Sequence, residues 1–194
     1  MTGRYLTLLQ RLDAWFAQAM AVHGDVIPCR AGCTACCHGP FDISPADAEL
    51  LREGLALLMP RDREEVRVRG ELLLTRMHEL APAWQAPWDL SDLGEEGFDR
   101  VAEALADEPC PLLGDDGRCR VYEHRPLVCR LIGLPMLTDL GETLENACPI
   151  QEQFPGYPEL PGVPFDYAAF ATEEVAILAT TPGPETTIAA VAAE

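Results

Sequence analysis

Residues 29–37 read CRAGCTACC and place four cysteines in the spacing C-x3-C-x2-C-C, at Cys29, Cys33, Cys36 and Cys37. Four thiols within nine residues suit a loop that wraps around a centre, because successive thiolates converge as the backbone turns. Cys36 and Cys37 are adjacent, so their side chains diverge. They more easily serve two metal ions, or two corners of a cluster, than one tetrahedral ion. The stretch therefore predicts a metal-binding loop.

The other four cysteines follow in a second region of the chain, at Cys110, Cys119, Cys129 and Cys148. Residues 114–117 read GDDG between two short apolar runs, which predicts a small hairpin from Cys110 to Tyr122. The return strand of this hairpin carries Cys119 towards Cys110. Eight thiolates match two four-ligand sites, of two zinc ions or two cubane clusters. We therefore expect all eight to ligate one compact metal centre or a pair.

Four arginines lie among the later cysteines, at Arg118, Arg120, Arg125 and Arg130. A four-thiolate site is net negative with either a zinc ion or an oxidised cubane, so nearby cations favour it. On one interpretation Arg120, Arg125 and Arg130 contact the cofactor as counter-charges or as hydrogen-bond donors to sulfur. On the other, the arginines solvate a loop or pair with local acids such as Asp115 and Glu123. The sequence leaves both interpretations open.

Two histidines lie close to cysteines in the sequence. His38 follows Cys37 directly, and His124 precedes Cys129 by five residues. Either could replace a cysteine ligand, since imidazole binds zinc and iron well. A lone histidine is more often a hydrogen-bonded structural residue, and we expect that role for both.

The two cysteine blocks resemble the signature blocks of a known family. The early C-x3-C-x2-C-C and the later CPLLGDDGRCRVYEHRPLVCRLIG, residues 110–133, are similar to those of the YkgJ-type cysteine-cluster family of zinc- or iron-chelating proteins. The matching features are Cys110-Pro111, Gly117, Cys119, Val121-Tyr122, Arg125-Pro126 and Cys129-Arg130. The resemblance spans roughly Cys29 to Cys148 and implies metal chelation by the cysteines. Leu131-Ile132 depart from it, because members often carry an aromatic residue after Cys-Arg.

The residues around the cysteines favour an iron–sulfur cluster slightly over a zinc ion. Cysteine is followed by proline twice, at Cys110 and Cys148, a pairing familiar from ferredoxin cluster loops. Zinc stays the alternative, because the hairpin with its flanking cysteines could act as a structural knuckle. The spacing from Cys29 to Cys36 also resembles radical-SAM cluster loops. The strand–helix alternation of that barrel is missing from the sequence, which argues against radical-SAM catalysis.

Thiol chemistry without metal explains the cysteines less well. A disulfide between adjacent Cys36 and Cys37 forms a small, strained ring and leaves six thiols unexplained. A secreted disulfide framework has the right even count, but residues 1–23 do not read as a signal peptide, because Arg4, Arg11 and Asp13 interrupt the apolar residues. We therefore expect a cytoplasmic protein, in a compartment where thiols stay reduced.

Hydrophobic periodicity outside the cysteine blocks predicts helices. Apolar residues from Tyr5 to Met20 recur at helical spacing and predict one helix that closes near Gly24. Ser44 as N-cap begins a second helix that stops at Pro60. Further helices are predicted over Arg61 to Leu80, Phe98 to Ala106 and Asp166 to Ala179. These segments predict a mainly α fold.

Two other segments are predicted to lack helices. Residues 81–97 read as a connecting loop in which Trp84 and Trp88 plug the core. Residues 180–194 are small, polar and proline-containing, and predict a flexible tail. The expected fold is a small, mainly α-helical domain over residues 1–179, with a short β-hairpin and irregular metal-binding loops.

Composition limits the partners. With 194 residues and 48% hydrophobic residues, the chain can bury a core without covalent staples. Its net charge of −18 comes from 32 acidic residues against 14 basic ones, all of which are arginine. Such a surface repels phosphate backbones, so we expect no nucleic-acid partner. No stretch approaches the roughly 18 apolar residues that cross a bilayer, so we expect no membrane partner. The predicted partner is a metal ion or cluster.

Overall fold

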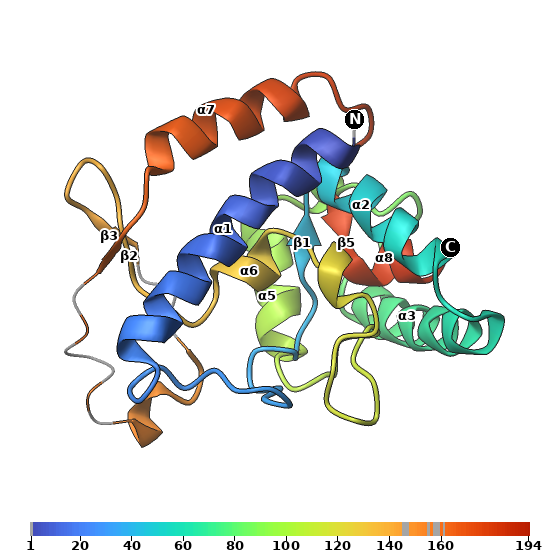
Figure 1. Ribbon diagram of the computed structural model, residues 1–194. Coiled ribbons are helices and arrows are strands. Elements are labelled where there is room, and N and C mark those ends of the chain that lie inside the picture. The colour runs from blue at the N-terminus through green and yellow to red at the C-terminus, as the bar shows by residue number, and fades with distance from the viewer. Residues whose placement is uncertain (1, 145–147, 155, 157–159, 161) are drawn as a thin grey trace.

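The computed structural model describes residues 2–144, 148–154, 156, 160 and 162–194, and its fold is mainly α-helical (Figure 1). The α-helices are α1 (Thr2–His23), α2 (Pro45–Ala56), α3 (Pro60–Leu80), α4 (Leu90–Leu93), α5 (Glu95–Ala104), α6 (Val128–Leu131), α7 (Tyr167–Leu178) and α8 (Ile188–Ala192). The 3-10 turns are η1 (Tyr122–His124) and η2 (Gln151–Gln153). The strands are β1 (Asp42–Ile43), β2 (Met136–Leu137), β3 (Thr143–Leu144), β4 (Val163–Pro164) and β5 (Thr186–Thr187).

Helix α1 lies across the molecule and packs against α2, α6 and α7 (Figure 1). Its inner face forms the α1 cluster, a hydrophobic core whose buried members include Leu9, Leu12, Ile27, Leu134 and Phe170. Burying each such side chain contributes about 1.5–3 kcal/mol. The helix ends at His23, next to Gly24, as predicted. A side chain at Gly24 would not fit, because its Cβ would lie 2.6 Å from the Met20 carbonyl oxygen.

The N-cap predicted at Ser44 begins α2, and the structure shows that it forms a capping box with Asp47. The Ser44 Oγ accepts a hydrogen bond from the Asp47 backbone N–H at 3.1 Å, and the Asp47 carboxylate accepts one from the Ser44 N–H at 3.3 Å. The helix ends at Ala56, before the predicted stop at Pro60. Pro60 instead opens α3, because the fixed φ of proline suits the first helical position and its missing N–H costs nothing there.

The C-terminal segment belongs to the core, so the prediction of a flexible tail over residues 180–194 is wrong for its second half. Strand β5 pairs antiparallel with β1, with Thr187 opposite Asp42. Helix α8 buries Ile188, Val191 and Ala192 in the α2–α8 cluster, a second hydrophobic core that also contains Leu51, Leu55, Val66 and Leu112. Helix α8 approaches α3 closely, because a Cβ at Gly70 would lie only 2.9 Å from the Ala189 carbonyl oxygen. Small residues that suggested a frayed end are the ones this close packing needs.

The predicted loop over residues 81–97 is shorter than expected, since it contains α4 and the start of α5. Asp89 caps α4 by accepting a hydrogen bond from the Ser91 N–H at 2.9 Å. Trp84 is 1% exposed and donates from Nε1 to the Asp89 carbonyl oxygen at 2.8 Å. The prediction that this tryptophan plugs the core is confirmed, whereas Trp88 is half-buried at the rim.

The hairpin predicted from Cys110 to Tyr122 is a tight turn with one isolated bridge, between Leu113 and Cys119. The Gly114 N–H donates to the Arg118 carbonyl oxygen at 2.8 Å, and the Arg120 N–H donates to that of Leu112 at 2.9 Å. A hairpin of regular strands occurs elsewhere, where β2 and β3 pair antiparallel and β4 joins β2 in parallel. Among the helices in the described part of the chain, none is long and apolar enough to cross a bilayer.

Candidate metal centre

The segments that carry cysteines gather at one end of the molecule. In Figure 1 the loop after α1, the segment around residues 105–122 and η2 all lie along the lower edge, drawn in blue, yellow-green and orange. Helices cover the opposite side. Cysteines more than 100 residues apart in sequence, such as Cys29 and Cys148, thereby become neighbours that interact through charge.

Backbone hydrogen bonds join the early cysteine loop to the later one. The Cys110 N–H donates to the Cys37 carbonyl oxygen at 2.9 Å, and the Gly39 N–H donates to that of Glu108 at 2.6 Å. A second contact lies between Gly32 and Gly117, where a Cβ on Gly117 would be 3.3 Å from the Gly32 carbonyl oxygen. These contacts hold the two loops side by side without help from side chains.

All eight cysteines are free thiols, and their charge interactions divide them into two sets. Burial, and then the charges of Cys148, Cys36 and Cys33, raise the pKa of Cys29 to about 11. Burial also raises the pKa of Cys129, with Cys110 and Cys119 as its nearest contributing thiols. We name the sets the Cys36 group (Cys29, Cys33, Cys36 and Cys148) and the Cys37 group (Cys37, Cys110, Cys119 and Cys129).

The adjacent pair Cys36 and Cys37 connects the two groups. Cys36 donates a thiol hydrogen bond to the Cys37 sulfur, which lowers the pKa of Cys37 and raises that of Cys36. Cys37 senses the charges of Cys110, Cys129 and Cys119. Cys36 contributes to the pKa of Cys29 and Cys148, and also to that of Cys129. The two thiols therefore contact each other, contrary to the divergence expected for adjacent side chains, although most of their other neighbours differ.

Three thiols accept hydrogen bonds from backbone N–H groups two residues further along the chain. Leu112 donates to Cys110, Val121 to Cys119 and Ile150 to Cys148. Each of these bonds lowers the pKa of its thiol, although burial outweighs it and leaves all three pKa values raised, that of Cys110 to about 12. Such donors stabilise a thiolate and fix its direction, which is what a metal ligand requires.

The donor set fits a soft metal centre, but the described side chains are not already closed around one. Among the residues that the structure describes, no three or more His, Cys, Asp or Glu side chains are grouped closely enough to hold a metal ion. The thiols of each group lie within range of one another's charge, so ligation requires them to rotate towards a common point. Thiolate-only sites select zinc or iron–sulfur clusters.

Three of the arginines among the later cysteines pair with carboxylates from distant helices. Arg120 contacts Asp62 at 3.0 Å and Glu65 at 2.9 Å on α3. Arg125 and Arg130 both bind the carboxylate of Asp13 on α1. These partners differ from the local acids considered in the sequence, and Arg118 is exposed. A cofactor-binding role for Arg120, Arg125 and Arg130 stays a prediction.

Arg130 braces the segment that carries Cys129. Its side chain is buried, and burial lowers its pKa. Its Nε donates to the Arg125 carbonyl oxygen at 3.0 Å, and its Nη2 donates to the Glu123 carbonyl oxygen at 2.9 Å. Together with the ion pair to Asp13, these bonds fix η1 and α6 against α1.

Two arginine charges act on the thiols themselves. Arg125 lowers the pKa of Cys119, against the larger effect of burial, and so belongs to the electrostatic surroundings of the Cys37 group. Arg30 does the same for Cys29 in the Cys36 group, and its Nη1 also donates to the Cys29 carbonyl oxygen at 2.7 Å. The sequence analysis missed Arg30, although its position directly after Cys29 is a usable signal.

The two histidines near cysteines make structural contacts. His38 is half-buried, and its backbone forms an isolated antiparallel β-bridge with Pro109. His124 packs against Gly54 of α2, where an added Cβ would lie 2.6 Å from the His124 Cβ. The structural role expected for both imidazoles stays a prediction.

Asp47 supports the site in a way that the sequence analysis missed, since only its capping role is visible locally. Its carboxylate accepts hydrogen bonds at 2.9 Å from the Tyr5 hydroxyl, the Ser44 hydroxyl and the Leu127 backbone N–H. Leu127 lies two residues before Cys129. Asp47 is 3% exposed, and burial raises its pKa. One carboxylate thus ties α1 and α2 to the Cys129 segment.

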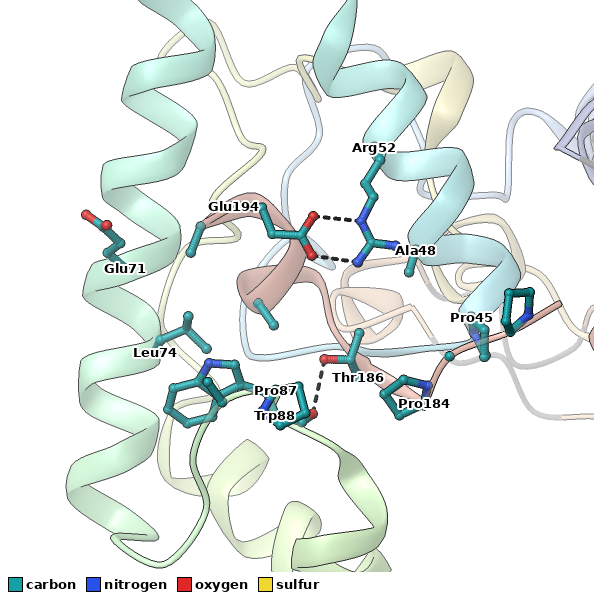
Figure 2. Close-up of a pocket in the computed structure, with 15 residues that line it drawn as sticks. Pro45, Ala48, Arg52, Glu71, Leu74, Pro87, Trp88, Pro184, Thr186 and Glu194 are labelled. Carbon is teal, nitrogen blue, oxygen red and sulfur yellow. Dashed lines mark hydrogen bonds and ion pairs between the residues drawn. The ribbon is translucent and has the colours of Figure 1, made fainter.

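A cleft of about 480 Å³ lies apart from the cysteines, between α2, α3, residues 86–88 and the C-terminal segment (Figure 2). Its lining is largely apolar and includes Leu74 and Trp88. Figure 2 shows Arg52 and Glu194 joined across one side by two hydrogen bonds of 2.6 and 2.5 Å. No cysteine is among the residues that line it.

The two four-thiol sets, hydrogen-bonded by backbone N–H groups, define a cysteine-cluster domain of the metal-chelating class. The chain belongs to the CxxCxxCC family, described as "Putative zinc- or iron-chelating domain", whose model matches residues 28–149. All eight cysteines fall within that range. Comparison with curated proteins and with solved structures found no match.

Proposed function

We propose that the protein holds an iron–sulfur centre through its cysteine thiolates and uses it for electron transfer, or for sensing or delivering metal. The observation that carries this proposal is that eight free thiols lie on loops joined side by side by backbone hydrogen bonds, and that three of the thiols accept backbone N–H bonds. A bound cluster supplies reversible one-electron chemistry.

The chain's own residues then set the properties of the centre. Cys110, Cys119 and Cys129 pack against the α2–α8 cluster, which limits access of water to that side. Backbone donors and the charges of Arg30 and Arg125 favour the thiolate form. Solvent access and hydrogen bonds to sulfur are the principal means by which a protein adjusts the potential of such a cluster.

The second candidate is a structural zinc site, with function on the helical surface as a protein-interaction module. It is favoured by the irregular course of the cysteine-bearing segments, where only β1, η1 and short turns interrupt the loops between α1 and α2 and between α5 and α6. Segments of this kind gain order from a metal ion, and four thiolates suit zinc in such a role.

Metal and sulfide analysis, with an absorption spectrum, on protein expressed and purified without oxygen tests the proposal. We expect broad absorbance at roughly 400 nm and about four iron and four sulfide per site. Colourless protein with stoichiometric zinc contradicts the iron–sulfur assignment and supports the structural candidate. Protein that carries neither metal contradicts both.

Cys33→Ser and Cys129→Ser test the ligand assignment in the same preparation. Each variant is expected to lose metal relative to the wild type. Metal content unchanged in both variants would overturn the assignment of these cysteines as ligands.

A further inference from the structure

We infer that the eight cysteines form two separate four-thiol metal sites, one from Cys29, Cys33, Cys36 and Cys148 and the other from Cys37, Cys110, Cys119 and Cys129. The inference rests on the proposed function and goes further by assigning each thiol to a site. The adjacent cysteines are divided between the sites, so that one peptide bond joins the two ligand shells.

The Cys37 group is assembled by the backbone. The Cys110 N–H donates to the Cys37 carbonyl oxygen at 2.9 Å, which places these two residues side by side. The turn at residues 114–117 returns the chain so that Cys119 bridges Leu113, three residues after Cys110. Cys129 is the second residue of α6. Together with Cys110 and Cys119, it packs against the α2–α8 cluster.

The Cys36 group lies on a different part of the core. Cys29 packs against the α1 cluster, not the α2–α8 cluster. Its sulfur lies beside Gly133, where an added Cβ would be 2.8 Å from the Cys29 Sγ. Cys33 and Cys36 follow on the same loop. Cys148 is 5% exposed and interacts through charge with Cys29, Cys33 and Cys36.

The division of the adjacent cysteines follows from these neighbours. Cys37 interacts with all three other members of its group, whereas Cys36 interacts with Cys29 and Cys148. Cys36 also interacts with Cys129, but Cys110 and Cys119 act on Cys129 more strongly than Cys36 does. Their mutual thiol hydrogen bond must break when each sulfur turns to its own site. A four-thiolate site is net negative, so each needs a nearby cation. Arg30 lies beside the first group and Arg125 beside the second.

The test is zinc binding to the reduced full chain, read by intact mass and by labelling of unprotected thiols with N-ethylmaleimide. We expect two zinc ions per chain. At less than one equivalent of zinc, molecules should carry eight or four labels, because thiols become protected in sets of four. A single transition from eight labels to none would overturn the inference.

Two matched double variants identify the sets. In Cys110→Ser/Cys119→Ser, one zinc ion should remain, Cys37 should become labelled and Cys36 should stay protected. In Cys29→Ser/Cys33→Ser, one zinc ion should remain and the pattern should reverse, with Cys36 labelled and Cys37 protected. Fragmentation of the peptide between Cys36 and Cys37 reads this difference. Labelling of both, or protection of both, in either variant overturns the division.

The result also separates this inference from the proposed function. If wild-type protein takes all eight labels with zinc present and binds no iron, the proposed function fails. If it binds metal but protects its thiols as one unit, only the inference of two sites fails. Labelling at low zinc needs no substitution, so a variant that does not fold leaves the wild-type test intact.

Discussion

The Cys37 group and the Cys36 group offer the same four thiols but are supported by different kinds of structure. Three members of the Cys37 group pack against the α2–α8 cluster, and the fourth is tied to Cys110 by a backbone hydrogen bond. In the Cys36 group, Cys29 packs against the α1 cluster, while Cys33 is held by a turn in which its N–H donates to the Arg30 carbonyl oxygen at 2.9 Å. The first group is continuous with the core, and the second is built mainly on loops.

This difference indicates that the two groups contribute differently to stability. Removing a side chain from a packed core leaves a cavity or an unpaired polar group, whereas a loop relaxes around the change. We expect the Cys37 group to be coupled to folding of the whole domain. The Cys36 group should gain and lose metal with less effect on the rest of the chain.

The largest expected contrast is between Cys110→Ser and Cys33→Ser. Cys110 is 7% exposed, so a serine there buries a hydroxyl in an apolar site and should lower the free energy of unfolding by about 2–4 kcal/mol. Cys33→Ser should cost less than about 1 kcal/mol, because Cys33 is half-buried on a loop. Urea unfolding of both variants without metal measures the difference. Equal losses would remove the proposed distinction between the groups.

Asp47→Ala tests whether the hydrogen bond from Leu127 to Asp47 supports the Cys37 group. Removal of the carboxylate leaves the Leu127 N–H and the Tyr5 hydroxyl without their acceptor, which should cost about 2–3 kcal/mol. Tyr5→Phe is the matched control, because it removes one of these bonds and should cost about 1 kcal/mol. Zinc affinity at the Cys37 group should fall in Asp47→Ala and stay near the wild-type value in Tyr5→Phe, which leaves the Leu127 hydrogen bond in place. At the Cys36 group it should stay constant in both variants. The reverse pattern in thiol labelling would contradict the link through Leu127.

Arg30→Gln should act on the Cys36 group alone. The exposed guanidinium lowers the pKa of Cys29, so its loss should weaken zinc binding at that group a few-fold, with more effect at low salt. Arg52→Gln is the control, since Arg52 is also exposed and paired, but lies in the cleft that no cysteine lines. Competition with a zinc chelator measures both variants. Equal weakening at the two groups would show that Arg30 acts only through net charge.

The smallest expected effect concerns pH and Glu174, which faces Asp47. Burial, and then the charge of Asp47, raise the pKa of Glu174 above its ordinary value of 4.5. The folded protein therefore binds a proton at Glu174 more tightly than the unfolded chain does. The stability that protonated Glu174 contributes is present below pH 4.5 and is lost as the pH rises through the pKa of the folded state. Glu174→Gln should match the wild type at low pH and gain up to about 1 kcal/mol relative to it at neutral pH. Urea unfolding of the wild type and Glu174→Gln at several pH values measures the difference in their free energies of unfolding. A difference that does not change with pH would contradict the prediction.

Features encoded by neighbouring residues were predictable from the sequence. The periodicity of α1, the N-cap at Ser44 and the turn at residues 114–117 depend on a few consecutive residues. The two cysteine blocks were recognisable for the same reason, and the family assignment confirms the resemblance that they indicated.

Features made by distant residues were not predictable. The ion pairs from Arg125 and Arg130 to Asp13 span more than 100 residues, and no local pattern marks Asp13 as their partner. The pairing of β5 with β1 and the contact of α8 with Gly70 depend on chain segments that meet only in the folded state. Small apolar residues in the C-terminal segment carry too weak a periodic signal to indicate that they are buried.

The burial of α8 has a consequence for the nascent chain. Ile188, Val191 and Ala192 complete the hydrophobic cluster on which Cys110, Cys119 and Cys129 pack. During synthesis every cysteine leaves the ribosome before those residues do, since Cys148 is the last of the eight. For the time needed to translate about 40 further residues, the thiols are exposed to metal, oxidants and chaperones while the surface beneath them is incomplete. The Cys37 group therefore gains its complete packing surface only after α8 has been synthesised.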